Sequence, residues 1–315
     1  RYQMTMNGTD NIDMSGFKGV FPANPTPIKA DGSIHEEGLR AILEDNMSHG
    51  AQGFWVAGST GEGPILSEQQ RDTVARVSGE TTKGKALAIM HVGAISTESA
   101  VKGAKAAAES GCAAVCCVPP FFFQPNERAI IDHYKAVADA ADGLPLFAYN
   151  LPQLTQVEFV PALMDAVMKE VPTLKGLKHS AANFALIRDW ADRGLACFSG
   201  SGRLPLPALT MGAIGTVDAP LSLTPWLYTE LYDAYTAGNM TRAQELQDEV
   251  QAVVDMVVMY GAAAHVCKAI LSERLGIDMG ESIRPNNYLN LEEKAHVLSE
   301  AKKIGILEAP VAASV

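Results

Sequence analysis

The amino-acid sequence predicts an α/β fold in which eight parallel strands close into a (β/α)8 TIM barrel with a C-terminal helical extension. Short apolar segments that end in Gly, Pro, Asn or Ser alternate with longer segments of helical spacing. Strand–helix alternation with short connections is typical of a parallel sheet. The strand segments are apolar throughout rather than alternating, as expected for strands buried on both faces.

Eight strands and seven intervening helices follow from this pattern. The expected strands are 19–21, 53–57, 86–92, 113–118, 144–149, 174–178, 195–198 and 213–217. The expected helices are 37–49, 67–80, 97–110, 126–141, 160–169, 183–193 and 204–211. Eight units indicate a closed barrel rather than an open sheet. The first strand is not followed by a Gly-x-Gly-x-x-Gly motif, which argues against a dinucleotide-binding domain.

The pattern changes after residue 222. Four helical segments follow without a strand between them: 224–237, 240–260, 262–275 and 291–304. We therefore expect a leader, partly disordered, over 1–16, a barrel over 17–221 and a helical region over 222–315. The helical region is expected to pack on the barrel or on a neighbouring subunit.

Composition excludes several classes of function. The 315 residues include 25 Lys and Arg against 36 Asp and Glu, a net charge of −11, which disfavours binding to nucleic acid or an anionic membrane. No apolar run reaches the roughly 18 residues of a spanning helix. The first 15 residues are polar and lack the apolar core of a signal peptide. A cytoplasmic location fits these features best.

Cysteine and histidine spacing does not predict a metal site. The five cysteines include no Cys-x-x-Cys pair, and the cluster at 112, 116 and 117 has the apolar context of a buried strand. We expect structural thiols in a reducing compartment, and no metal. Ser199-Gly200-Ser201-Gly202 also lacks the order expected of a nucleophile turn.

Lys178 is the strongest candidate for catalysis, because active sites of barrels lie at the carboxyl ends of the strands. In a regular strand Leu174, Gly176 and Lys178 share one face. If that face is the barrel axis, Gly176 leaves space for the long side chain. Burying an ammonium is costly, so a neutral amine becomes available to attack a ketone and form an imine. The alternative is a solvated lysine at the strand edge.

Two further segments offer matching chemistry. Gly58-Ser59-Thr60-Gly61-Glu62 has the pattern of an anion nest, in which backbone N–H groups and the hydroxyls of Ser59 and Thr60 hold a carboxylate. The alternative is an ordinary capped helix start. Glu62 is expected to be structural, since it would repel a substrate carboxylate. Tyr149 is a candidate proton relay, or else an aromatic at the barrel rim.

Together these segments resemble the dihydrodipicolinate synthase / N-acetylneuraminate lyase superfamily of class I Schiff-base aldolases, over residues 17–307. The motifs that carry the resemblance are Gly58-Ser59-Thr60-Gly61-Glu62, Tyr149-Asn150-Leu151-Pro152, Gly176-Leu177-Lys178-His179-Ser180 and Gly212-Ala213-Ile214-Gly215-Thr216. The resemblance implies Lys178 as the imine-forming residue, Ser59 and Thr60 as the carboxylate site, and Tyr149 with Ser59 as the proton relay. It also implies a homotetramer, no metal, no organic cofactor, and pyruvate as the common ligand.

The resemblance is closer to the lyase branch. Synthases usually place an Arg two residues after the Pro of the Tyr-Asn-x-Pro motif, where this chain has Leu154. Ser180 stands where lyases carry a Thr or Ser near the substrate hydroxyls, and Gly200 and Thr216 are expected in the same pocket. Sialic-acid lyases commonly present an acidic pair after the seventh strand, where this chain has Gly202 and Arg203. Arg203 would favour an anionic or differently shaped tail, or else faces solvent.

A second departure concerns Phe122, at a position where many members offer a Tyr to a neighbouring subunit's relay. Either the relay runs from Tyr149 through Ser59 to water, or another group substitutes; His91 is a candidate pocket residue. The sequence predicts a pyruvate-dependent Schiff-base lyase or aldolase acting on a 2-oxo(-3-deoxy) acid, similar to N-acetylneuraminate lyase. The alternatives are a sugar-acid dehydratase or aldolase, a dihydrodipicolinate synthase, and a barrel that binds an oxo acid without turnover.

Overall fold

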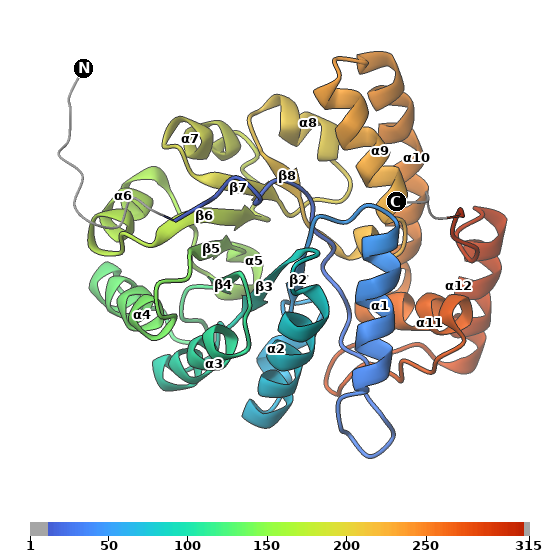
Figure 1. Ribbon diagram of the computed structural model, residues 1–315, viewed down its shortest axis with the longest axis horizontal. Coiled ribbons are helices and arrows are strands. Elements are labelled where there is room, and N and C mark those ends of the chain that lie inside the picture. The colour runs from blue at the N-terminus through green and yellow to red at the C-terminus, as the bar shows by residue number, and fades with distance from the viewer. Residues whose placement is uncertain (1–11, 312–315) are drawn as a thin grey trace.

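A computed structural model describes residues 12–311. Its sheet contains eight parallel strands, and the predicted (β/α)8 barrel is confirmed (Figure 1). The strands are β1 (Gly19–Val20), β2 (Gly53–Val56), β3 (Leu87–His91), β4 (Ala114–Cys117), β5 (Leu146–Asn150), β6 (Leu174–His179), β7 (Ala196–Ser199) and β8 (Gly215–Thr216). The strand order runs β1-β8-β7-β6-β5-β4-β3-β2.

The barrel closes between β1 and β2 through single contacts rather than a full ladder. Gln52 N–H donates to the carbonyl of Val20, and Trp55 N–H donates to the carbonyl of Pro22. Ala23 and Trp55 form an isolated parallel bridge. These contacts join the two end strands of the eight-stranded sheet.

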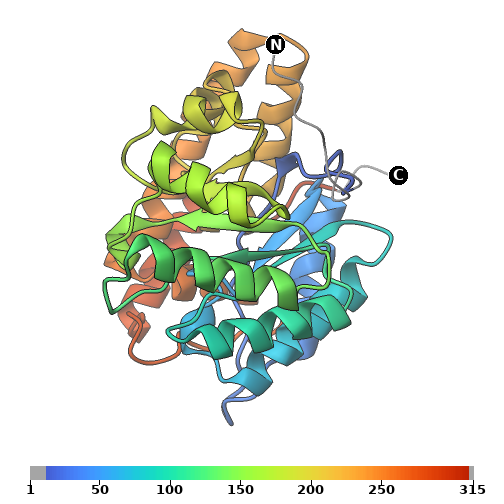
Figure 2. The ribbon, with the colours of Figure 1, turned by 90° about the vertical axis from the view of Figure 1, so that its left-hand side faces the viewer.

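Helices surround the strands, as Figure 2 shows from the side. They are α1 (Glu36–Ser48), α2 (Glu68–Thr82), α3 (Thr97–Glu109), α4 (Glu127–Ala140), α6 (Pro161–Glu170), α7 (Leu186–Asp192) and α8 (Pro205–Thr210). The sequence pattern missed four short elements: α5 (Pro152–Thr155) and the 3₁₀ turns η1 (Gly63–Ile65), η2 (Ala219–Ser222) and η3 (Met259–Gly261). A single turn carries too few residues to show a helical period.

The predicted C-terminal helices are present on one side of the barrel, orange to red in Figure 1. They are α9 (Pro225–Thr236), α10 (Met240–Val258), α11 (Ala263–Leu275) and α12 (Leu291–Lys303). In the described part of the chain, no single helix is long and apolar enough to cross a membrane; the bent pair 240–261 and 263–275 passes that test by length and composition only. The predicted leader lies mostly outside the described residues, although Met14 packs against the barrel core.

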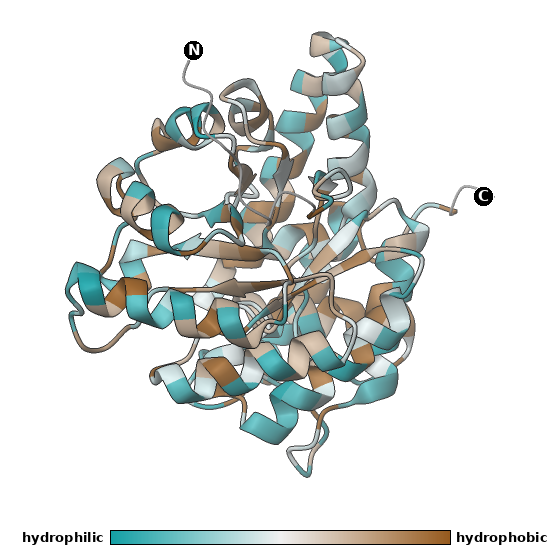
Figure 3. Cartoon of the chain, turned by 60° about the vertical axis from the view of Figure 1, so that its left-hand side comes forward, coloured by the Kyte–Doolittle hydropathy of each residue, from teal (hydrophilic) through white to brown (hydrophobic). Residues whose placement is uncertain are grey.

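Apolar side chains fill two layers, one on each side of the strands. The strand sequences are therefore apolar throughout rather than alternating. Inside the barrel, Phe21, Trp55, Phe147 and Phe198 pack edge to face. A second layer lies between the strands and the helices. Figure 3 shows the apolar strands at the centre and helices whose polar residues face outward. This packing holds the carboxyl ends of the strands rigid around one opening.

The predicted alternation along β6 holds for Gly176 and Lys178 but is wrong for Leu174. The register between β5 and β6 shifts at Leu146, so that Phe147 lies opposite Gly176 rather than opposite residue 175. Leu174 consequently packs in the outer layer. A Cβ at Gly176 would lie 2.4 Å from Cε1 of Phe147. The missing side chain therefore makes room for the Phe147 ring rather than for the lysine.

Candidate active site

Lys178 is the penultimate residue of β6 and lies inside the barrel. Its residue is 3% exposed, and Nζ lies 4.6 Å from the ring centroid of Tyr149 and 5.9 Å from that of Trp55. Aromatic faces carry negative potential but provide no acceptor as strong as a carboxylate. The lysine is therefore not a solvated residue at a strand edge, and its amine lies among apolar rings at the carboxyl end of the sheet.

Tyr149 is the penultimate residue of β5 and lies directly beside Lys178, because these two residues are register partners. Its hydroxyl lies 3.3 Å from Oγ of Ser59, and either oxygen can donate. His91 packs edge-on against the Tyr149 ring, with 5.9 Å between centroids. The structure thus brings the predicted amine, phenol and hydroxyl together.

His91 is buried in the neutral form. Its Nδ1 donates to the carbonyl of Ala57 at 3.1 Å, since a carbonyl only accepts. Burial lowers the pKa of His91 to about 3, with the hydrogen bond to Ala57 opposing and the charge of Lys178 adding to the shift. The other nitrogen, Nε2, is buried without a hydrogen-bond partner among the described residues. A neutral imidazole here shapes the pocket rather than carrying charge.

The loop after β2 holds Ser59 and Thr60 in a strained turn. Two residues that are not glycine, Ala57 and Glu62, have positive φ values of 53° and 57°. Gly63 permits the turn to close, because a Cβ there would lie 1.7 Å from the carbonyl oxygen of Ala57. Within residues 12–311, the N–H groups of Ser59 and Thr60 donate to no backbone carbonyl. This is the geometry expected of an anion nest.

Glu62 is structural, as predicted. Its carboxylate accepts from Nζ of Lys268 at 2.6 Å, and both side chains are fully buried. Burial lowers the pKa of Lys268, although the charge of Glu62 opposes that shift. The pair connects α11 of the C-terminal region to the Ser59 loop.

The side of the opening next to β6 and β7 carries Ser180, Gly200 and Arg203, which line one cavity of about 390 Å³ together with Ser59 and Tyr149. A Cβ at residue 200 would lie 1.9 Å from Oγ of Ser180, so any larger residue there would turn this hydroxyl away. The guanidinium of Arg203 pairs with Asp255 at 2.5 Å and donates to Gln251. Its charge is therefore already compensated by α10.

Three predicted positions, Lys178, Thr216 and Phe122, are not among the residues that line these cavities. Thr216 is 3% exposed at the end of β8, opposite Ser199, and lines none of the cavities described here. Phe122 has a positive φ of 77° and is 80% exposed beside Phe123. Phe121 instead points into a small apolar cavity of about 190 Å³ with His91 and Tyr149.

Asp218 is a site residue that the sequence analysis missed. It follows β8, lines the cavities on both sides of Ser59, and accepts backbone N–H groups from Gly202 and Ala219, each at 2.8 Å. Burial raises its pKa, against the opposing charge of Lys178. Its position two residues after Thr216, at the end of a predicted strand, was the available signal.

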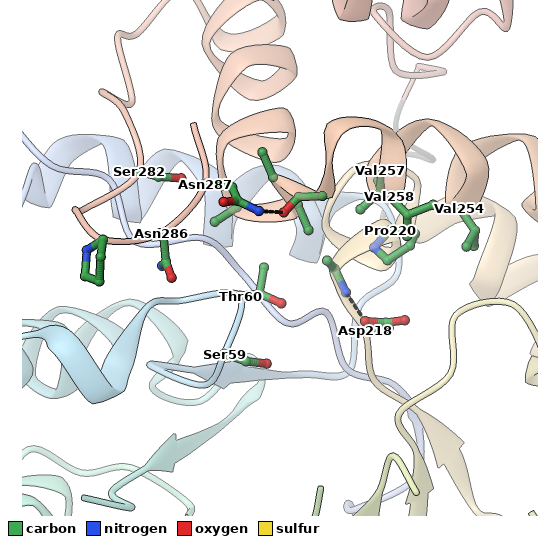
Figure 4. A pocket seen from close by; sticks show the side chains of 16 residues that line it. Ser59, Thr60, Asp218, Pro220, Val254, Val257, Val258, Ser282, Asn286 and Asn287 are labelled. Carbon is green, nitrogen blue, oxygen red and sulfur yellow. Dashed lines mark hydrogen bonds between the residues drawn. The ribbon is translucent and has the colours of Figure 1, made fainter. Parts of the chain in front are cut away.

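Three cavities meet at Ser59. One extends over Ser180 and Arg203, one is the apolar cavity at His91, and the third, of about 400 Å³, runs past Thr60 and Asp218 toward the C-terminal helices (Figure 4). Over residues 12–311, no group of three or more His, Cys, Asp or Glu side chains is placed to hold a metal ion. All five cysteines are buried thiols, as predicted.

Comparison with known proteins supports the family resemblance that the sequence motifs carry. The model of the dihydrodipicolinate synthetase family matches residues 16–304. The chain is 34% identical to 4-hydroxy-tetrahydrodipicolinate synthase of Methanothrix thermoacetophila over 73% of this chain and 78% of that protein. It is 31% identical to N-acetylneuraminate lyase of Citrobacter koseri over 78% of this chain and 82% of that protein.

Among solved structures, a catalytic lysine mutant of Ruminococcus gnavus sialic acid aldolase superposes with a TM-score of 0.88. The two chains are 26% identical, over 93% of this chain and 97% of the aldolase. Relatives in both the synthase and lyase branches match over most of their length. The chain therefore belongs to the dihydrodipicolinate synthetase family, and it is an enzyme of the class I aldolase type with carbon–carbon lyase chemistry.

Proposed function

We propose that the protein is a pyruvate-dependent Schiff-base lyase or aldolase that acts on a 2-oxo acid, with Lys178 as the imine-forming residue. The observation that carries the proposal is the buried Nζ of Lys178 4.6 Å from the ring of Tyr149, whose hydroxyl contacts Ser59. The name of the solved relative, a catalytic lysine mutant, also supports a lysine mechanism.

In the proposed reaction, Nζ of Lys178 attacks the C2 ketone, and water leaves with a proton from the Tyr149 hydroxyl, so that a protonated imine and the Tyr149 phenolate form. The nest at Ser59 and Thr60 holds the carboxylate at C1. The C3–C4 bond then breaks, its electron pair moves toward the protonated imine, and Tyr149 accepts the proton of the C4 hydroxyl. An aldehyde departs, C3 takes up a proton, and hydrolysis of the imine returns pyruvate and the free amine.

Dehydration through the same imine is the second candidate, and Asp218 is the observation that favours it. Asp218 lines two of the cavities at Ser59, and burial raises the pKa of its carboxyl, which favours a role as the acid that protonates a departing C4 hydroxyl. In that case a proton leaves C3, the C4 hydroxyl departs as water, and no aldehyde forms. Product analysis separates the two reactions, because only cleavage releases pyruvate.

Trapping with borohydride tests the lysine directly. Incubation with pyruvate and borohydride is expected to add the mass of one reduced pyruvate to the chain, with the adduct on the peptide that contains Lys178. Lys178→Met is expected to abolish the adduct. The matched control is Lys175→Met on the same strand, which leaves it intact. An adduct in Lys178→Met, or none in the wild type, would refute the proposal.

We also propose that copies of the chain associate as a homotetramer. Phe122 and Phe123 are 80% and 71% exposed, and Leu154 nearby in the apolar cavity lining is 65% exposed. Large exposed apolar side chains gathered at one opening favour a protein interface. Light scattering of the purified protein checks this, and a monomeric mass would contradict it.

A further inference from the structure

His49 lies between the end of α1 and the segment 306–311, which lies beyond α12. It is the first residue after α1 and precedes β2, so it lies at the amino end of the strands, opposite the candidate active site. Its side chain is 8% exposed, and the ring of Trp226 in α9 packs edge-on against it, with 5.4 Å between centroids. No step of the proposed lysine chemistry uses this histidine.

Both ring nitrogens of His49 face carbonyl oxygens. Nδ1 lies 2.7 Å from the carbonyl oxygen of Asp45, and Nε2 lies 3.0 Å from that of Pro310. Because a carbonyl oxygen only accepts, each nitrogen must carry a hydrogen for both bonds to form. Only the protonated, positively charged imidazole has two such donors. A neutral ring would direct one lone pair at a carbonyl oxygen, and that hydrogen bond would be lost.

The charges around His49 come from the elements packed against it. Within α1, the carboxylate of Asp45 lies 3.5 Å from Nδ1, and the carbonyl groups at the end of the helix add partial negative charge. Arg274 of α11 lies 3.7 Å from the same carboxylate and is the opposing positive charge. Trp226 of α9 is uncharged, and the one charged side chain of the segment 306–311 is the exposed Glu308. A positive charge on His49 therefore has a carboxylate partner within the fold.

Two side chains of the described residues donate hydrogen bonds to the segment 306–311, and they respond differently to pH. Arg274 donates to the carbonyl of Ile306, whose side chain is buried, and a guanidinium stays charged throughout the ordinary pH range. His49 holds Pro310, four residues further along. Asp45 is fixed in α1, whereas residues 306–311 lie in no helix or strand. Loss of the proton from His49 would therefore release the segment rather than the helix end.

We propose that His49 is a pH-dependent latch for residues 308–311. When its ring is protonated, these residues are docked on the end of α1. When the ring is neutral, Nδ1 keeps its hydrogen and its bond to Asp45, the lone pair of Nε2 faces the carbonyl of Pro310, and the docked residues detach. Arg274 retains Ile306 in both states. Docking is thus favoured in acid and lost as the pH rises, because only the docked state needs the second proton.

Cleavage by a glutamyl endopeptidase after Glu308 measures the release, because Glu308 must leave the surface to enter the protease. The rate is followed by the mass of the product that ends at Glu308. It is divided at each pH by the rate for a peptide with the sequence 304–315, which removes the protease's own pH dependence. The normalised rate of the wild type is expected to be about 10-fold higher at pH 8.5 than at pH 5.5, as loss of a charge-assisted hydrogen bond predicts.

His49→Gln does not titrate in this range, so its normalised rate is expected to be the same at both pH values. The matched control is His296→Gln, because His296 lies in α12 and bonds to Tyr260 rather than to the segment 306–311. It should keep the rise of the wild type. A wild-type rate that does not change with pH, or an equal rise in His49→Gln, would overturn the proposal. Pyruvate trapping is measured separately, so failure of the latch leaves the proposed function intact.

Discussion

Lys268 and Glu62 form a fully buried ion pair, 2.6 Å between Nζ and Oε2, across 206 positions of sequence. Lys268 also donates to the carbonyl of Glu281, and the other oxygen of Glu62 accepts from the backbone of Ile283. Glu62 holds a positive φ in the loop that presents Ser59 and Thr60. The C-terminal helical region thus fixes a strained loop of the candidate active site.

Lys268→Met is expected to destabilise the protein by about 3–5 kcal/mol, because it leaves a buried carboxylate without its counter-charge. Urea unfolding followed by circular dichroism measures the change. The double variant Glu62→Leu, Lys268→Met is expected to recover part of the loss, since it removes the uncompensated charge. Arg242→Ala, which breaks exposed ion pairs with Glu230 and Glu249, is the control and should cost at most about 1 kcal/mol. Equal effects at both sites would refute the argument.

Tyr149→Phe separates imine formation from proton transfer. The phenol hydroxyl contacts Ser59 at 3.3 Å, whereas the ring packs beside Lys178, so the variant keeps the packing and loses the relay. We expect kcat to fall about 10²- to 10⁴-fold, the usual contribution of a positioned acid–base group. Borohydride trapping of pyruvate should persist. Tyr235→Phe, whose hydroxyl donates to Leu209 far along the chain, is the control. Unchanged turnover in Tyr149→Phe would exclude it as the relay.

The sequence pattern predicted the fold because each strand is buried on both faces and each helix carries its own period. The same local signals failed at Leu174, where the register shift between β5 and β6 breaks the alternation. A bulge depends on how two strands pair, and the composition of one strand does not encode it. Lys178 was nevertheless placed correctly, because the alternation resumes at Gly176.

Candidate site residues were predictable where they lie close to the carboxyl end of a strand, as Lys178 and Tyr149 do, or in the loop that follows one, as Ser59 does. The cavity of about 400 Å³ beside Thr60 and Asp218 was not predictable, because its walls come from segments near residues 59, 218, 257 and 282. Residues 264–271 of α11 are buried all round the helix, so its sequence shows no single face from which the neighbouring loop could be predicted. Long-range packing of this kind has no local signature in the sequence.

Stability is expected to fall in acid because of buried neutral histidines. Burial lowers the pKa of His91 to about 3 and that of His133 to about 4, against about 6.5 in the unfolded chain. Between pH 6.5 and these values the unfolded state binds protons that the folded state excludes, so stability is full above pH 6.5 and declines below it. The pKa shift of His91 alone corresponds to a total loss of about 5 kcal/mol in unfolding free energy once the pH is below both pKa values.

Urea unfolding at several pH values between 7 and 4 checks this dependence. His91→Leu should show a shallower decline than the wild type, even though loss of the bond to Ala57 lowers its stability at neutral pH. Met90→Leu, a buried neighbour that does not titrate, should keep the steeper decline. Parallel curves for His91→Leu and the wild type would contradict the assignment of a neutral buried imidazole.

Gly176→Ala tests the packing beneath Lys178. The new Cβ would lie 2.4 Å from the Phe147 ring and 2.5 Å from the carbonyl oxygen of Ala196, so the ring or a strand must shift. We expect a loss of about 1–3 kcal/mol in unfolding free energy. The control is Gly103→Ala in α3, where the new Cβ would meet only Val92, at 3.3 Å and beyond, and the helix gains propensity. Because Phe147 and Lys178 share the barrel interior, Gly176→Ala should also slow pyruvate trapping. Gly103→Ala should leave the trapping rate unchanged. A Gly176→Ala variant as stable and as reactive as the wild type would show that the interior repacks freely around the lysine.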